Sequence, residues 1–313
     1  MWGSMSGSAI LTTPEETSVL HTVTVTVNNA CNLRCTHCYL QYQSDTNELL
    51  DPKTVTWLAA SEFAHIAIVG KEPLANRRSA EFVSQAVEQF TRSGKSVSLI
   101  TNGLNARLLG SETVQQLAWI DISVDGGIES FGRHGRGPLA SLERAVDHFR
   151  EKGCKKLRSL NTISAANIKD IPDILSLSDH LDFDLTIFAP YFRTASLRPQ
   201  YAEMVAPSSY LKGFASINLE KRAGKVVILI GSKYFDAFNE SRSDSIKAML
   251  PLMQAGILKE IDGDPIDRGL MRVTFDDLVL KPLESLHTVG YQGSGRRVNR
   301  LQTAEETFAR LRN

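Results

Sequence analysis

The sequence has little cysteine and no excess of either charge. Only four of its 313 residues are cysteines, and 35 basic residues balance 35 acidic ones. Four cysteines, three of them bunched, do not make the disulfide framework of a small secreted domain. A net charge of zero does not favour a nucleic-acid partner recognised by bulk charge. We therefore expect a protein of the reducing cytoplasm that binds no nucleic acid.

Long hydrophobic runs and low-complexity segments are also missing. No apolar stretch approaches the roughly 18 to 20 residues of a membrane span. The N-terminal stretch "MWGSMSGSAILTTPEE" has no basic region followed by an apolar segment, so it does not resemble a signal peptide. We expect no membrane partner.

What the sequence does contain is a regular alternation of short apolar runs and helical stretches. The runs that we expect to be strands are HTVTVTV (21–27), HIAIVG (65–70), SVSLIT (96–101), WIDISVD (119–125), LRSLNTI (157–163) and FDLTIFA (183–189). Helices should begin at Pro52 behind an Asp51 N-cap, near Ala80, behind a Ser111 N-cap, after Pro138 and at Ile168. Such alternation implies parallel strands joined by right-handed crossovers. Periodicity alone does not distinguish an open doubly wound sheet from a barrel or partial barrel.

The pattern continues less regularly after residue 206. We expect a helix over 210–221, a strand over 225–230, a helix from Ser243, a strand over 271–275 and a helical tail from Thr303. We therefore divide the chain into an α/β core, residues 20–206, and a C-terminal α+β extension, residues 207–313.

Three cysteines lie within eight residues, in the stretch "CNLRCTHCYL" that follows the first expected strand. Cys31, Cys35 and Cys38 could be small core residues. With His37 they could also form a zinc site, although a second pair of ligands is missing. Alternatively, their thiolates could hold an iron–sulfur cluster, with one iron left without a protein ligand.

The C-x3-C-x2-C spacing after the first strand, with the motifs below in the same order, resembles the radical S-adenosylmethionine (SAM) superfamily. The resemblance implies a partial (β/α)6 TIM-type barrel. It also implies that Cys31, Cys35 and Cys38 bind one [4Fe–4S] cluster and that SAM is the second cofactor. Parallel barrels place their sites at the C-terminal ends of the strands.

The stretch "GKEPL" resembles the family's Gly-Gly-Glu-Pro motif, which meets the amino group of SAM. The resemblance implies that Gly70, Lys71, Glu72 and Pro73 contact this group. A carboxylate opposite an ammonium makes a charge-assisted hydrogen bond. Lys71 departs from the family's second glycine.

Further cofactor contacts are implied at the ends of the later strands. Thr101 and Asn102 in "LITNG" should face the cofactor. In "ISVDG", which resembles the family's Ser-x-Asp-Gly, Ser123 should reach the SAM carboxylate or ribose, and Asp125 lies on the same strand face. Arg136 in "GRHGRGP" should bind the SAM carboxylate, with Arg133 as an alternative. The resemblance further implies that Asn161 contacts the ribose, that the backbone of Ile187 and Phe188 lines the adenine, and that His37 or Tyr39 lies against it.

These residues imply an enzyme that reductively cleaves SAM to a 5′-deoxyadenosyl radical, which abstracts a hydrogen atom from a peptide or natural-product substrate. The alternatives are a radical SAM enzyme that modifies a nucleotide or sugar, and a non-catalytic zinc or iron–sulfur module. An electron donor such as flavodoxin or ferredoxin is implied as a partner. No cysteine follows Cys154, so we expect an extension without a cluster, and a buried rather than catalytic Cys154.

Overall fold

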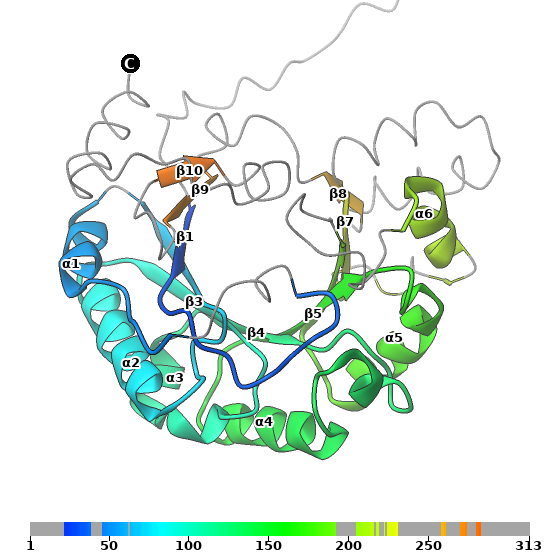
Figure 1. Ribbon diagram of the computed structural model, residues 1–313, viewed down its shortest axis with the longest axis horizontal. Coiled ribbons are helices and arrows are strands. Elements are labelled where there is room, and N and C mark those ends of the chain that lie inside the picture. Colours follow the sequence, from blue (N-terminus) through cyan, green and yellow to red (C-terminus); the bar gives the residue numbers. More distant parts are fainter. Residues whose placement is uncertain are drawn as a thin grey trace, which may run out of the picture.

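The chain folds into one curved sheet with helices along its outer face (Figure 1). The structure is a computed structural model and describes residues 22–38, 46–61, 63–191, 205–215, 217–218, 222, 224–230, 258–260, 270–273 and 280–282. Tyr39 and the helices predicted from residues 243 and 303 lie outside these ranges.

Strands and helices alternate through the described residues from 22 to 190, as the sequence predicts. The elements of this part are β1 (Thr22–Thr26), α1 (Pro52–Ala60), β2 (His65–Val69), α2 (Arg77–Arg92), β3 (Ser96–Thr101), η1 (Ala106–Leu108), α3 (Ser111–Gln116), β4 (Trp119–Ser123), η2 (Phe131–His134), α4 (Leu139–Glu151), β5 (Leu157–Ile163), η3 (Ile168–Asp170), α5 (Ile171–His180) and β6 (Leu185–Pro190). Asp51 caps α1 as predicted, whereas the N-cap of α3 is Gly110 and Ser111 is already helical.

The C-terminal elements add strands to both edges of the same sheet. They are α6 (Pro207–Ala215), β7 (Val226–Ile230), β8 (Leu258–Glu260), β9 (Leu270–Val273) and β10 (Leu280–Pro282). The strand order is β10-β9-β1-β2-β3-β4-β5-β6-β7-β8, with β10 antiparallel to β9 and every other pair parallel. Because β8 and β10 are edge strands, the barrel is open within the described residues, as a partial barrel predicts. The sequence did not predict β8.

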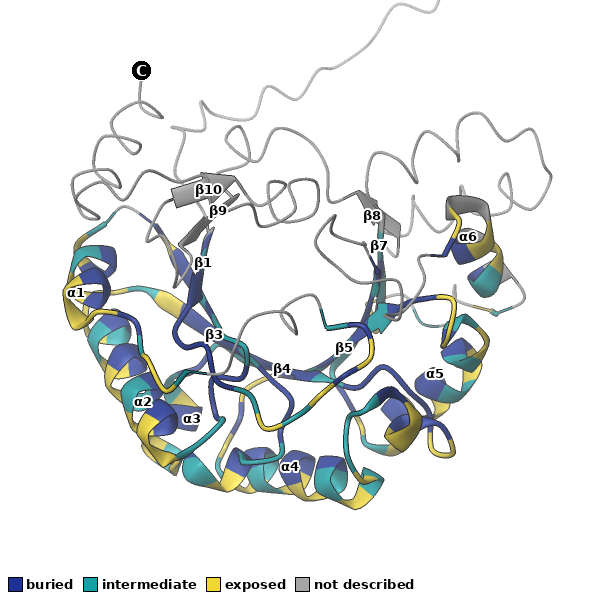
Figure 2. Ribbon diagram, viewed as in Figure 1, coloured by how far each residue is buried: buried dark blue, intermediate teal, exposed yellow. Residues whose placement is uncertain are grey.

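The core lies between the sheet and the outer helices. On β1 to β4 every second residue is an aliphatic side chain that packs under the helices: Val23, Val25, Ile66, Ile68, Val97, Leu99, Ile120 and Ile122. Phe90 of α2 and Phe149 of α4 fill the same layer. Figure 2 shows buried residues along the sheet and on the sheet-facing sides of these helices. Since strand side chains alternate, the intervening residues face the inside of the barrel.

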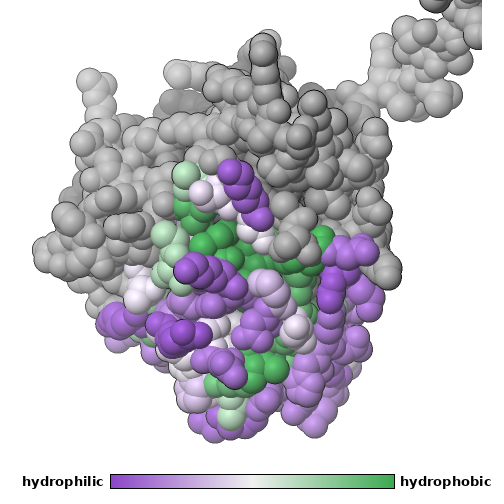
Figure 3. Space-filling view, turned by 90° about the vertical axis from the view of Figure 1, so that its right-hand side faces the viewer, coloured by the Kyte–Doolittle hydropathy of each residue, from purple (hydrophilic) through white to green (hydrophobic). Residues whose placement is uncertain are grey.

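Helix α6 continues the outer layer past β6. Phe188 of β6 packs edge-to-face on Phe214, with ring centroids 5.1 Å apart, and Tyr210 donates to the Phe188 carbonyl at 3.2 Å. Figure 3 looks at the side where α5 and α6 lie and shows hydrophobic residues gathered in the centre of the described surface. A search of the described residues finds no helix with the length and apolar character of a membrane span.

Candidate functional site

The three clustered cysteines lie on the loop that leaves the C-terminal end of β1. The chain first continues along β2, where Val27 N–H donates to the Val69 carbonyl at 2.8 Å, and then turns so that Cys38 N–H meets the Cys35 carbonyl at 3.1 Å. Cys35 is buried, whereas Cys31 and Cys38 are partly exposed, and no disulfide involves them. All three thiols therefore lie at the mouth of the barrel.

The donor set fits an iron–sulfur cluster better than a single metal ion. Within the described ranges, no three His, Cys, Asp or Glu side chains converge on one ion position. A cluster does not need such convergence, because each thiolate binds a separate iron. Burial raises the pKa of the Cys35 thiol to about 11, an effect that the Arg136 charge opposes and Asp125 and Cys38 reinforce.

Glu72, at the turn after β2, has its carboxylate enclosed by protein donors. Its Oε1 accepts from the Thr101 hydroxyl at 2.5 Å and from Leu74 N–H at 2.9 Å, and its Oε2 accepts from Asn102 N–H at 2.7 Å. Burial raises the pKa of Glu72, while these three hydrogen bonds favour the ionised form. The predicted residues Glu72, Thr101 and Asn102 thus come together, and the carboxylate joins the β2 loop to the β3 loop.

A second contact ties the β3 loop to the cysteines. The Asn102 side-chain amide donates to Asn32 Oδ1 at 2.8 Å, and Asn32 is the residue immediately after Cys31. The Glu72 N–H also donates to the Ala30 carbonyl at 2.9 Å. Both strand-end loops therefore support the cysteine loop from one side.

Gly70 occupies a position that excludes a side chain. A Cβ there would lie 2.3 Å from Oδ1 of Asn28. The Asn28 amide donates to the Glu72 carbonyl at 2.7 Å, and its backbone carbonyl accepts from Lys71 N–H at 3.3 Å. Asn28 was not predicted, and nothing in its local sequence pattern marks it.

His37, Asp125 and Arg136, which we call the mouth triad, meet at the centre of the barrel mouth. Asp125 Oδ2 lies 3.0 Å from His37 Nε2 and 2.5 Å from Arg136 Nε, and the guanidinium lies 3.1 Å from His37. Burial would raise the pKa of Asp125, but the charges of Arg136 and His37 and the N–H of Thr162 hold it below its usual range. As the structure stands, Arg136 pairs with a protein carboxylate and His37 is hydrogen-bonded.

The backbone around Asp125 is held by Asn161, which the sequence marked, and by Thr162 and Asn167, which it did not mark. Asp125 has a φ of 61°, and its carboxylate accepts from Thr162 N–H at 2.5 Å. Asn161 accepts from Asp125 N–H at 3.2 Å, and Asn167 donates to the Asp125 carbonyl at 2.9 Å. Asn161 is fully buried and also donates to the Ile187 carbonyl at 3.1 Å. In this structure Asn161 therefore positions Asp125, and its ribose contact stays a prediction.

The loop between η2 and α4 packs directly on the cysteines. Gly135 has a φ of 75°, and a Cβ there would lie 2.8 Å from the Arg34 carbonyl oxygen and 3.0 Å from Cys35 Cα. Its carbonyl oxygen is 3.5 Å from Cys35 Sγ. Glycine is the residue that tolerates both this conformation and this approach. The chain that carries Arg136 is thereby brought against the cysteine loop.

The remaining predicted residues border the same mouth. Ser123 ends β4 and is partly exposed, Pro73 is buried beside Glu72, and the Ile187 side chain is buried. The Phe188 side chain packs on Phe214 of α6, and the contact of its backbone with the adenine stays a prediction. Tyr191, after β6, has its ring edge-on to His37 at 6.5 Å between centroids. The prediction for Tyr39 lies outside the described residues.

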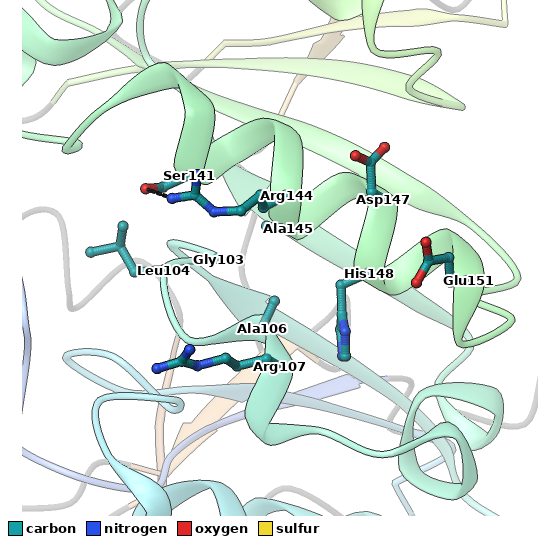
Figure 4. A pocket seen from close by; sticks show the side chains of 10 residues that line it. All are labelled: Gly103, Leu104, Ala106, Arg107, Ser141, Arg144, Ala145, Asp147, His148 and Glu151. Atoms are coloured by element: carbon teal, nitrogen blue, oxygen red, sulfur yellow. Dashed lines mark hydrogen bonds between the residues drawn. The ribbon is translucent and has the colours of Figure 1, made fainter.

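A surface pocket lies apart from this mouth, between η1 and α4 (Figure 4). It is lined by Gly103, Leu104, Ala106, Arg107, Ser141, Arg144, Ala145, Asp147, His148 and Glu151. Figure 4 shows Arg144 turned toward Ser141, to which it donates at 2.9 Å. The two arginines and two carboxylates leave the lining without a net charge, and none of the predicted cofactor residues contributes to it.

Comparison with known proteins agrees with this geometry. The family model described as the Radical SAM superfamily matches residues 25–177. A curated relative, "Probable GTP 3',8-cyclase" of Sulfolobus acidocaldarius, is 23% identical over 172 residues, which are 53% of this chain and 54% of the relative. The alignment therefore spans about half of the relative's length.

Solved structures share the fold over most of the chain. Streptococcus suis SuiB bound to S-adenosylmethionine has a TM-score of 0.68 at 13% identity, covering 91% of this chain and 64% of SuiB. SuiB bound to precursor peptide SuiA has a TM-score of 0.63 at 14% identity, covering 89% and 62%. Native anSMEcpe with bound AdoMet and Cp18Cys peptide has a TM-score of 0.61 at 15% identity, covering 91% and 80%.

The family match includes the cysteine loop, the Glu72 turn and the mouth triad residues. The cofactors of this family are a [4Fe–4S] cluster and S-adenosylmethionine, which agrees with the thiol set at the barrel mouth. Residues 25–177 therefore form a radical SAM domain.

Proposed function

We propose that this enzyme abstracts a hydrogen atom from a peptide substrate. One observation carries the proposal: the fold likeness to SuiB and anSMEcpe extends over about nine tenths of the chain, 91% in both cases, and therefore beyond the family-matched core. Both proteins have been solved with a peptide. The substrate class is inferred by analogy of fold.

In this proposal Cys31, Cys35 and Cys38 hold the cluster. Their loop is supported by Asn102 on one side and by Gly135 on the other, which keeps the thiols at the mouth. When bound, the reduced cluster and SAM together supply hydrogen-atom abstraction from an unactivated C–H bond.

The protein's contribution to SAM binding comes from the strand-end loops. The Glu72 carboxylate already accepts three hydrogen bonds, so we assign it the role of shaping the turn over residues 70–73, with the backbone of that turn next to the amino group of SAM. Ser123 and Arg136 are the polar side chains at the mouth that suit a carboxylate. Arg136 would then pair with the Asp125 carboxylate and with the SAM carboxylate at the same time.

A second candidate function is the modification of a nucleotide. The observation that favours it is the 23% identity to the probable GTP 3',8-cyclase. In either case an electron must reach the cluster, and a flavodoxin or ferredoxin remains the proposed donor, with the cytoplasm as the proposed compartment.

The test is anaerobic reconstitution with iron and sulfide, followed by assay of 5′-deoxyadenosine in the presence of dithionite and SAM. We expect about four irons per chain, since one cubane on cysteine thiolates contains four. Peptides encoded beside the gene should increase 5′-deoxyadenosine release and lose hydrogen, whereas GTP should not. Stimulation by GTP alone would favour the nucleotide alternative. A protein that binds zinc and forms no 5′-deoxyadenosine would refute both.

A further inference from the structure

We propose that Asp125 and Arg136 are an opposed charge pair that sets how easily the cluster is reduced, with Asp125 acting as a positioning residue for Arg136. This inference rests on the proposed ligation of the cluster by Cys31, Cys35 and Cys38. It assigns the pair a role that does not depend on bound SAM.

The position of Asp125 is fixed by four separate contacts. Its carboxylate accepts from Thr162 N–H at 2.5 Å and from Arg136 Nε at 2.5 Å, its N–H donates to Asn161, and its carbonyl accepts from Asn167. The side chain has no exposed surface. A carboxylate held in this way cannot turn toward solvent, so its charge stays at the mouth.

The position of Arg136 follows from that of Asp125. Its side chain is 12% exposed, and its guanidinium contacts both Asp125 and His37. The adjacent Gly135 brings this segment onto the cysteine loop, with its carbonyl oxygen 3.5 Å from Cys35 Sγ. Arg136 thus follows directly on the residue whose backbone packs against Cys35.

The pair lies next to the cysteine loop. His37, the residue before Cys38, lies 3.0 Å from Asp125 Oδ2 and 3.1 Å from the Arg136 guanidinium, and the carbonyl oxygen of Gly135, the residue before Arg136, is 3.5 Å from Cys35 Sγ. Both members of the pair therefore lie within electrostatic reach of the cysteine loop. A buried charge at such a distance is screened far less than a surface charge.

Reduction adds one electron to the cluster and breaks no bond, so the cluster becomes one unit more negative. A nearby cation favours this change and a nearby anion opposes it. In the parent protein the two charges largely offset each other. Loss of the Asp125 charge should therefore make reduction of the cluster more favourable, and loss of the Arg136 charge should make it less favourable. Loss of both charges should return the reduction potential to that of the parent.

The experiment is a redox titration of the reconstituted protein without SAM, monitored by electron paramagnetic resonance and with dithionite as the one-electron reductant. Asp125→Asn should make reduction more favourable by roughly tenfold, which is 59 mV for a one-electron couple. Arg136→Gln should make it less favourable by a similar factor, and the double variant should return close to the parent. Arg136→Lys, which keeps the charge, should also stay close to the parent.

Asp179→Asn provides the matched control. It removes one carboxylate from the exposed Asp179–Arg222 pair on α5, where Asp179 is 52% exposed, and should leave the potential unchanged. A merely structural role of the mouth triad would shift Asp125→Asn and Arg136→Gln in the same direction or not at all, and this result would overturn the inference.

Iron content and circular dichroism separate the remaining outcomes. If the parent binds no cluster, the proposed function itself is wrong. If Asp125→Asn does not load iron, the reduction potentials of Arg136→Gln and Arg136→Lys decide. Less favourable reduction in Arg136→Gln alone supports the inference, and equal potentials in the two variants overturn it. If neither Asp125→Asn nor Arg136→Gln loads iron while both keep the fold, the pair is needed for assembly rather than for tuning, and the inference is overturned.

Discussion

The two ends of the barrel each contain a histidine, a buried aspartate and an arginine, and they are built differently. At the N-terminal end, which we call the base cluster, His65, Trp119, Asp121 and Arg158 come from β2, β4 and β5. At the mouth, His37, Asp125 and Arg136 come from three loops. The base cluster therefore depends on strand register, and the mouth triad on loop conformation.

The base cluster satisfies its own charges completely. Arg158 makes two parallel bonds to Asp121, at 2.6 and 2.7 Å, and its guanidinium carbon lies 4.5 Å from the Trp119 ring centroid. Trp119 also donates from Nε1 to Asp121 Oδ2 at 3.2 Å and stacks on His65 at 4.3 Å between centroids. His65 is bonded to Ser96 and Ser98 at 3.0 and 2.9 Å. This arrangement pairs the carboxylate and the guanidinium of the base cluster with each other.

The mouth triad instead lies against the cysteine loop, where His37 precedes Cys38 and the residue before Arg136 contacts Cys35. Asp125 has left-handed backbone geometry, which is uncommon for a residue other than glycine. Unusual backbone conformations of this kind tend to cluster at functional sites. The comparison teaches that the same residue types support the fold at one end and, in the proposed function, border the cofactor site at the other.

The sharpest test of this division uses the cysteines. Cys35→Ala should remove most of the cluster iron, because two thiolates do not anchor a cubane that requires cysteine ligands. Cys154→Ala is the control, since Cys154 lies at the other end of the barrel, just before β5. Iron and sulfide assays after reconstitution should show a near-complete loss for Cys35→Ala and none for Cys154→Ala. Equal loss of iron in both variants would contradict the assignment of the cluster to the mouth of the barrel and not to its base.

The next effect concerns the stability of the base. Asp121→Asn should lower the free energy of unfolding by about 3 kcal/mol, because it leaves the largely buried Arg158 charge without a partner. Iron content should be unchanged at permissive temperature. Urea denaturation measures the loss, and Asp179→Asn, at an exposed pair, should cost no more than about 1 kcal/mol. A loss of iron in folded Asp121→Asn would show that the base also serves the cofactor site.

A smaller effect is expected at the Glu72 turn. Glu72→Gln places an amide where Thr101, Leu74 N–H and Asn102 N–H all donate, so one donor is left unmatched at a cost of about 1 to 3 kcal/mol. We expect lower stability and weaker SAM binding by calorimetry, with the iron content retained. Thr101→Val removes one donor and leaves the carboxylate, so its effect should be smaller. Unchanged SAM binding in Glu72→Gln would show that the turn over residues 70–73 does not contribute to SAM binding.

The smallest effect is a pH dependence at the base. Burial, together with the Arg158 charge, lowers the pKa of His65 from 6.5 to about 4. Between these values the unfolded chain binds the proton and the folded protein does not, so the stability contributed at neutral pH is lost as the pH falls.

Thermal unfolding at pH 7 and pH 5 tests whether stability falls with pH in this way. The parent should lose more stability than His65→Gln, and each 1 kcal/mol of difference corresponds to roughly 2 to 4 °C in Tm for domains of 150–250 residues. His180→Gln, on the exposed end of α5, should behave as the parent does. Equal losses in the parent and in His65→Gln would contradict the assignment.

Much of the fold could be predicted because its signals are local. The alternation of β1, the Asp51 cap before Pro52 and the period of α2 each lie within one element. The short strand β8 was missed because its three residues show no period. The pairing of β9 with β1 joins residues almost 250 positions apart, and no local pattern encodes such a pairing.

The sequence by itself determined the order of strands and helices and the set of three clustered thiols, because periodicity, caps and ligand spacing act over a few residues. Only the tertiary structure decided what the polar residues contact. It placed the Glu72 carboxylate on Thr101 and Asn102, Asn28 against Gly70, and Arg136 on Asp125 rather than in an open site. The physical reason is that buried polar groups must be satisfied, and their partners are chosen by which loops the barrel brings together.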